Sequence, residues 1–124
     1  MRIGVDLARV GELDGLLPRP WFRRYFFTAD ELRQAGDLAA PRAAEFLTGR
    51  FAAKEAVLKV LGRGLFEGVS PRDIEVVRQD SGEPGVRLSG GARDAAERVG
   101  VTSMTVSIAH KGPDVVAVAI GAVR

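Results

Sequence analysis

The chain has 124 residues, which suits one domain with one core, and it contains no cysteine, which excludes disulfides, thiolate metal sites and a cysteine nucleophile. No apolar run approaches the ~20 residues of a membrane span, and Asp6 interrupts the segment where a signal peptide would be apolar, so we expect a cytoplasmic protein. The net charge of +2 does not indicate a nucleic-acid binder, but a pI of about 9.5 permits a basic patch for an acidic partner.

Residues 2–8 predict a strand, because two sets of side chains alternate along them: Ile3, Val5 and Leu7 on one side, and Arg2, Gly4 and Asp6 on the other. Aspartate is rare inside strands. Asp6 therefore marks either a functional position or an early end of the strand, where it would cap the next turn. Residues 9–20 predict a helical turn or two, interrupted by two prolines.

Residues 21–27 are aromatic and basic. Phe22 and Phe26 share one helical face, and three arginines surround them: Arg19, Arg23 and Arg24. The pattern fits two structures equally well. One is the edge of a core with a solvated basic rim, and the other is a docking surface for an acidic partner.

Two helices are predicted next. Thr28 and Glu31 form a capping box, which is typical of a helix start, and this short helix extends to about residue 34 before Gly36 ends it. The second helix covers residues 41–62, which are rich in strong helix formers. It is apolar nearly all round, as is typical of a helix buried in the middle of its domain.

Glu55 lies within an apolar stripe of the long helix, between Phe51 and Leu58. An ordinary surface pair with Lys59, worth ~0.2–0.5 kcal/mol, is one explanation, but such a pair belongs outside an apolar stripe. A carboxylate directed towards a core needs a partner, because a stranded charge is costly. A metal ion, or a ligand phosphate near Lys59, would provide one.

The second half predicts two hairpins separated by a helix. After a glycine-rich loop at residues 62–70, the strands cover 73–78, 86–88, 104–110 and 115–123, and the helix covers 92–99. His110, the only histidine, lies at a strand end, although a lone histidine is more often structural than catalytic. The order of elements indicates one α+β domain over residues 1–124, with an antiparallel sheet packed on the long helix.

Asp6 and Glu55 are thus two acids in unexpected places. Carboxylates, waters and substrate phosphates together are how proteins hold Mg²⁺, and Lys59 and His110 could neutralise phosphate. The sequence contains neither a P-loop nor a GxGxxG motif. Magnesium-dependent phosphate chemistry without a P-loop is therefore one hypothesis.

Four motifs occur in order along the chain: Ile-Gly-Val-Asp-Leu at 3–7, Phe-Thr-x-x-Glu-Leu at 27–32, Gly-Arg-Phe-Ala-Ala-Lys-Glu-Ala-x-x-Lys-x-Leu-Gly at 49–62, and Val-Ser-Ile-Ala-His at 106–110. They carry a resemblance, from end to end, to the holo-[acyl-carrier-protein] synthase family of short 4′-phosphopantetheinyl transferases. The third motif is the most specific of the four.

The resemblance implies the phosphopantetheinyl transferase fold, a homotrimer with active sites between subunits, and transfer of phosphopantetheine from coenzyme A to a serine of an acidic apo acyl carrier protein. It implies that Asp6 and Glu55 bind Mg²⁺. It also implies that Lys59 and His110 hold the coenzyme A phosphates close to the reaction, and that Arg50 helps to bind the nucleotide. The general base, Glu55 or a metal-bound water, stays open, as does the pathway of the carrier.

Two departures from the family pattern bear on carrier affinity: Ala109 replaces a frequent serine, and Tyr25 replaces a usual arginine. Two alternatives to the enzyme are also compatible with the sequence. One is an inactive or pathway-specific paralogue that binds coenzyme A or a carrier without general turnover. The other is a basic RNA-binding α+β domain, which the low net charge and the absence of an aromatic strand pair disfavour.

Overall fold

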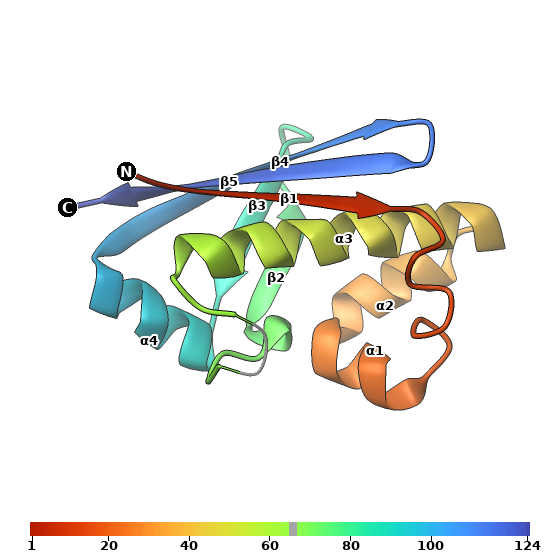
Figure 1. Ribbon diagram of the computed structural model, residues 1–124, viewed down its shortest axis with the longest axis horizontal. Coiled ribbons are helices and arrows are strands. Elements are labelled where there is room, and N and C mark those ends of the chain that lie inside the picture. The colour runs from red at the N-terminus through yellow and green to blue at the C-terminus, as the bar shows by residue number, and fades with distance from the viewer. Residues whose placement is uncertain (65–66) are drawn as a thin grey trace.

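The computed structural model describes residues 1–64 and 67–124, which form an antiparallel sheet packed on one long helix, with shorter helices on the other side of that helix (Figure 1). The strands are β1 (Arg2–Arg9), β2 (Ile74–Arg78), β3 (Pro84–Leu88), β4 (Val101–Lys111) and β5 (Asp114–Val123). The helices are α1 (Pro20–Phe26), α2 (Ala29–Gly36), α3 (Ala40–Val60), α4 (Gly90–Val99) and the 3₁₀ turn η1 (Pro71–Asp73). The predicted α+β class is confirmed.

The strand order in the sheet is β1-β5-β4-β3-β2, and every neighbouring pair is antiparallel. Both predicted hairpins, β2–β3 and β4–β5, are present. The last strand, β5, lies between β1 and β4, which explains why it is so apolar. The chain termini lie at the same end of the sheet (Figure 1).

Helix α3 is buried from residue 47 to residue 60 except at Arg50, Phe51, Glu55 and Lys59, as its apolar sequence predicts. One core cluster lies between α3, the sheet and α4, and a second lies between α3 and the segment that includes α1 and α2. The predicted capping box at Thr28 is present. None of the helices in the described part of the chain has the length and hydrophobicity needed to span a membrane.

One prediction needs correction, one of the two alternatives for Asp6 is excluded, and one prediction lies partly outside the described residues. Residues 10–18 form hydrogen-bonded turns, and helix begins only at Pro20, because glycines and prolines interrupt the segment. Strand β1 continues to Arg9, so Asp6 does not cap a turn. The predicted loop at 62–70 includes residues 65 and 66, which are outside the described residues.

Strand β1 lies directly against the backbone of α3. A Cβ placed on Gly4 would be 2.0 Å from the carbonyl oxygen of Ala56, so only glycine allows this approach. The side of β1 that carries Gly4, Asp6 and Ala8 therefore faces the helix. The apolar side faces outwards instead: Ile3, Val5 and Leu7 are 59%, 47% and 75% exposed.

We expect Gly4→Ala to destabilise the protein by at least ~1–3 kcal/mol, because the added methyl group must push β1 away from backbone atoms that cannot move aside. Gly36→Ala is the matched control, since a Cβ at Gly36 meets nothing within 4 Å. Denaturant unfolding of the two variants measures the difference. A Gly4→Ala protein as stable as the wild type would show that β1 is not held at this distance.

Candidate active site

Asp6, Glu55 and Lys59 come together where β1 crosses α3. Lys59 Nζ lies 3.4 Å from Asp6 Oδ1 and donates a hydrogen bond of 2.7 Å to the carbonyl oxygen of Val5. Glu55 and Lys59 are one helical turn apart on α3. Asp6 lies close enough to Glu55 for its negative charge to raise the pKa of Glu55. Three of the predicted site residues thus lie together in the structure. We call this cluster of Asp6, Glu55 and Lys59 the carboxylate group.

The carboxylate group contains more negative than positive charge. Burial raises the pKa of Asp6 above its ordinary value, Lys59 opposes this shift, and Glu12 adds to it. Burial also raises the pKa of Glu55, and the neighbouring Asp6 raises it further, while Lys59 opposes. One ammonium group therefore faces two partly desolvated carboxylates, which is an arrangement that a bound cation would stabilise.

The donor set fits Mg²⁺. Magnesium prefers oxygen ligands, and one or two carboxylates with waters and substrate phosphates are its usual shell in phosphate-transferring sites. Asp6 and Glu55 are such a pair, on two rigid elements, and each is only partly buried, which leaves access for waters and a phosphate. Groups of three or more metal-binding side chains do not occur among residues 1–64 and 67–124.

Arg50 and His110 lie near adjacent residues of α3, because His110 approaches Gly49, and we call these two the arginine group. The guanidinium carbon of Arg50 lies 4.4 Å from the centre of the Phe46 ring, and its buried Nε has no hydrogen-bond partner. Burial lowers the pKa of Arg50, Glu31 opposes this shift, and Arg78 on β2 adds to it. His110 is exposed at the end of β4, and its Nε2 is 3.5 Å from the Cβ position of Gly49 on α3.

The two groups lie on different sides of α3. Arg50 and Glu55 are separated by about 140° around the helix axis and about 7.5 Å along it. Glu55 interacts with β1, whereas Arg50 interacts with Glu31 and Arg78. Within the described residues, no hydrogen bond or ion pair joins the two groups. One copy of the chain thus brings the predicted site residues together as two separate groups.

The predicted docking surface is only partly exposed. Phe22 and Phe26 are 5% and 1% exposed and stack in the second core cluster, so the prediction that they form the apolar centre of a docking surface is wrong. Their rings are buried because α1 packs against Phe51 of α3. Arg19 and Arg23 donate to the carbonyl oxygens of Gly15 and Leu17, and Arg24 is exposed.

Sequence reasoning missed a buried ion pair next to the site. Lys54 and Glu31 are both fully buried, and Lys54 Nζ lies 2.5 Å from Glu31 Oε1. Lys54 is spaced three and four residues from Val57 and Leu58, so the same periodicity that singled out Glu55 also places Lys54 towards the core. No sequence pattern indicated that Arg78, the last residue of β2, would lie near Arg50.

Comparison with known proteins identifies the class. A family model described as the 4′-phosphopantetheinyl transferase superfamily matches residues 2–119. The chain belongs to this superfamily.

Individual relatives narrow the assignment. The chain is 45% identical over 112 residues to a holo-[acyl-carrier-protein] synthase from Gloeobacter violaceus, covering 88% of this chain and 83% of the relative. It is 37% identical over 120 residues to the synthase from Desulfovibrio desulfuricans, covering 95% and 94%. A solved holo-(acyl-carrier-protein) synthase from Bacillus anthracis in complex with CoA (3′,5′-ADP) superposes with a TM-score of 0.81 at 31% identity, covering 99% and 96%. The family is therefore that of the holo-[acyl-carrier-protein] synthases, as the four motifs indicate.

The electrostatics of the carboxylate group predict that Glu55→Gln stabilises the metal-free protein at neutral pH. Because the folded-state pKa of Glu55 is raised, the folded protein binds this proton more tightly than the unfolded chain does, and the charged carboxylate lowers stability. The gain from Glu55→Gln should shrink as the pH falls through the raised pKa, and disappear below the ordinary value of 4.5.

Urea unfolding in a chelator at several pH values measures this effect. Glu45→Gln, an exposed substitution on the same helix, is the control and should change little. Equal stability of Glu55→Gln and the wild type at neutral pH would contradict the expected repulsion.

Proposed function

We infer that this chain is a holo-[acyl-carrier-protein] synthase, which transfers the 4′-phosphopantetheine group of coenzyme A to a serine of an apo acyl carrier protein. The family match over nearly the whole chain carries the inference. The pairing of Asp6 and Glu55 beside Lys59 supports it, because two neighbouring carboxylates can bind the Mg²⁺ ion that accompanies pyrophosphate chemistry. Coenzyme A is an intracellular metabolite, so the proposed location is the cytoplasm.

In this reaction the serine oxygen bonds to the phosphorus that carries pantetheine, the bond from that phosphorus to the bridging oxygen breaks, and 3′,5′-ADP leaves with the electron pair. The serine hydroxyl gives up its proton to a base, for which Glu55 is the candidate on this chain. Asp6 and Glu55 would hold Mg²⁺, which when bound supplies charge neutralisation on the pyrophosphate. Lys59 is placed to neutralise a phosphate oxygen beside this pair. Its ammonium is bound to Val5 and Asp6, so it is already directed towards the carboxylates.

Arg50 and His110 are proposed to bind the remaining phosphate of coenzyme A, with Arg78 nearby. The buried Nε of Arg50, which has no hydrogen-bond partner, supports this role, because a buried N–H without an acceptor is costly and a phosphate oxygen would provide one. Among the described residues, neither Arg50 nor Arg78 forms an ion pair with a carboxylate, so a bound phosphate would not have to displace one.

We further propose that the protein is a homotrimer in which the carboxylate group of one copy meets the arginine group of the next. The two groups lie on different sides of α3 within one copy, which supports a shared site. The outer side of the sheet also supports assembly, since Ile3, Val5 and Leu7 pair across the ladder with Ile120, Val118 and Val116 to form one apolar surface.

Loss of the metal ligands should abolish turnover. We expect Asp6→Ala and Glu55→Ala each to reduce the rate of transfer at least ~10²-fold, because the charge that develops on the pyrophosphate is no longer stabilised. The measurement is mass spectrometry of an apo carrier after incubation with coenzyme A, Mg²⁺ and enzyme, with circular dichroism to check folding. Glu45→Gln is the control. Wild-type turnover by a folded Asp6→Ala/Glu55→Ala protein would refute the metal assignment, and no turnover by the wild type would favour a non-catalytic paralogue.

Assembly gives the next prediction. Light scattering at micromolar concentration should give the mass of a trimer, and Ile3→Lys/Val5→Lys should give monomers, because two charges then lie in the apolar surface. Mixing unfolded Glu55→Ala and His110→Ala subunits and refolding them together should restore activity, since some sites then combine two intact halves. A monomeric or dimeric wild type, or mixed assemblies without activity, would contradict a shared site.

Carrier docking is proposed to use the exposed arginines at α1, because acyl carrier proteins are acidic. We expect Arg24→Glu, alone or with Arg23→Glu, to raise the KM for the carrier and to leave the KM for coenzyme A nearly unchanged. The single variant is the cleaner test, since Arg23 also holds the Leu17 carbonyl. The carrier KM should rise with salt, because exposed charges are screened beyond ~8–10 Å. Arg98→Glu on α4 is the control, and an unchanged carrier KM would place docking elsewhere.

A further inference from the structure

Lys54 is a buried lysine whose hydrogen-bonding capacity is fully used. Its ammonium group has three N–H donors. They reach the carbonyl oxygen of Phe26 at 2.8 Å, the carbonyl oxygen of Pro71 at 3.2 Å, and Glu31 Oε1 at 2.5 Å. These acceptors belong to the end of α1, to η1 and to α2, so one side chain of α3 is bound to three other elements.

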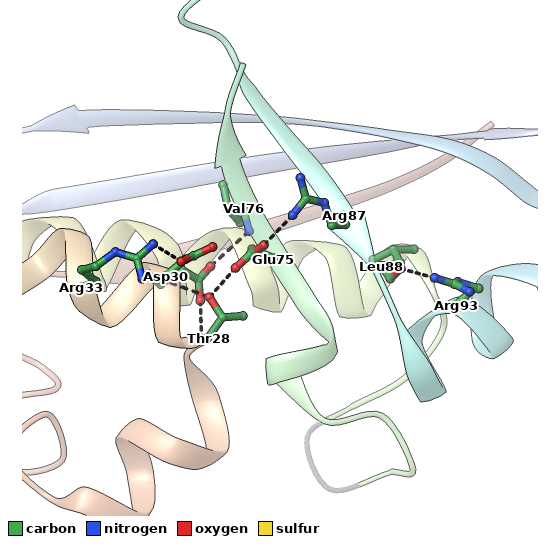
Figure 2. A network of polar contacts seen from close by, with 9 residues as sticks. Thr28, Asp30, Arg33, Glu75, Val76, Arg87, Leu88 and Arg93 are labelled. Atoms are coloured by element: carbon green, nitrogen blue, oxygen red, sulfur yellow. Dashed lines mark hydrogen bonds and ion pairs between the residues drawn. The ribbon is translucent and has the colours of Figure 1, made fainter. Parts of the chain in front are cut away.

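Glu31 extends the same connection to the sheet. Its Oε1 accepts from the backbone N–H of Thr28 at 2.9 Å, and its Oε2 accepts from the backbone N–H of Val76 on β2 at 3.1 Å. Figure 2 shows the next contacts, in which the hydroxyl of Thr28 donates to Glu75 Oε2 at 2.6 Å and Arg87 pairs with Glu75 at 3.2 Å. The network therefore joins the helices to the β2–β3 hairpin.

The position of Lys54 on α3 connects this network to the proposed site. Lys54 immediately precedes Glu55 and lies one turn after Arg50, which belongs to the arginine group. The hydrophobic effect is non-directional, so burial of apolar side chains alone does not specify the rotation of a helix about its axis. Hydrogen bonds weaken steeply when misaligned, so three bonds to three different elements restrict rotation and sliding of α3.

We propose that Lys54, held by Glu31, Phe26 and Pro71, is a positioning residue that fixes the rotation of α3 and thereby directs Glu55 towards Asp6. Gly4 sets how closely β1 approaches α3, and Lys54 sets which side of α3 is presented to it. This inference rests on the proposed role of Asp6 and Glu55 as metal ligands.

The test is Lys54→Met, which fills a similar volume and donates no hydrogen bond. At a temperature where the variant is folded, we expect Mg²⁺ affinity to fall about 10–100-fold, measured by calorimetric titration in the presence of 3′,5′-ADP. We expect kcat at saturating coenzyme A and carrier to fall by a similar factor at fixed Mg²⁺. Wild-type Mg²⁺ affinity and wild-type kcat in a folded Lys54→Met protein would overturn the proposal.

Ala95→Gly is the control for general loss of stability. Ala95 is 1% exposed on α4 and takes part in none of the hydrogen bonds of the network, so this change weakens the fold without removing a partner of Lys54. It should leave Mg²⁺ affinity and kcat at wild-type values at a temperature where it is folded. A loss of Mg²⁺ affinity in Ala95→Gly equal to that in Lys54→Met would also overturn the proposal.

If Lys54→Met does not fold, Glu31→Gln/Lys54→Met decides, because it leaves no buried charge without a partner. The same losses of Mg²⁺ affinity and kcat are expected in this double variant. Wild-type Mg²⁺ affinity and kcat, or failure of both variants to fold, would show that the Lys54–Glu31 pair serves folding alone and would overturn the proposal. Asp6→Asn and Glu55→Gln separate this result from the metal assignment. If their Mg²⁺ affinity equals that of the wild type, the metal assignment fails; if only Lys54→Met behaves as wild type, the positioning proposal alone fails.

Discussion

The backbone contact between β1 and α3 is the constraint on which the rest of this structure depends. Gly4 lies against the carbonyl oxygen of Ala56, closer than any residue with a Cβ could come. On the inward side of the strand, Arg2 donates to the carbonyl oxygen of Val60 on α3, and the carboxylate of Asp6 lies beside Lys59. The close approach therefore places the carboxylate of a strand beside the carboxylate of a helix.

The same contact explains why the sheet has an apolar outer side. Successive residues of a strand point to opposite faces, so the small inward residues leave Ile3, Val5 and Leu7 outside. A monomer would expose these side chains to water, and their ladder partners on β5 extend the surface. In the proposed trimer this surface is covered, and the half-sites on the two sides of α3 find their complements. In this proposal, local packing, assembly and catalysis are linked through one glycine.

Two clusters of charged residues at α3 differ in how many of their polar atoms have hydrogen-bond partners within the protein. Lys54 and Glu31 have hydrogen-bond partners for every donor of the lysine and for both carboxylate oxygens, as a structural ion pair requires. Asp6 and Glu55 share one lysine, and burial raises the pKa of both. Unsatisfied charge of this kind is typical of a site that a ligand or metal completes.

The sequence by itself determined most of the elements, the family, and which residues are candidates for the site. The alternation in β1, the capping box at Thr28, the long apolar helix and the two hairpins all follow from local patterns, and the motifs at Asp6 and Glu55 indicate the family. Residues 10–18 were mispredicted because the two glycines and one proline there allow turns as readily as a helix. Only the tertiary structure decided that Phe22 and Phe26 are buried, that Lys54 pairs with Glu31, and that Arg50 and Glu55 lie on different sides of α3. The physical reason is that periodicity fixes side-chain directions only relative to the axis of each element, whereas burial and pairing depend on atoms contributed by distant parts of the chain.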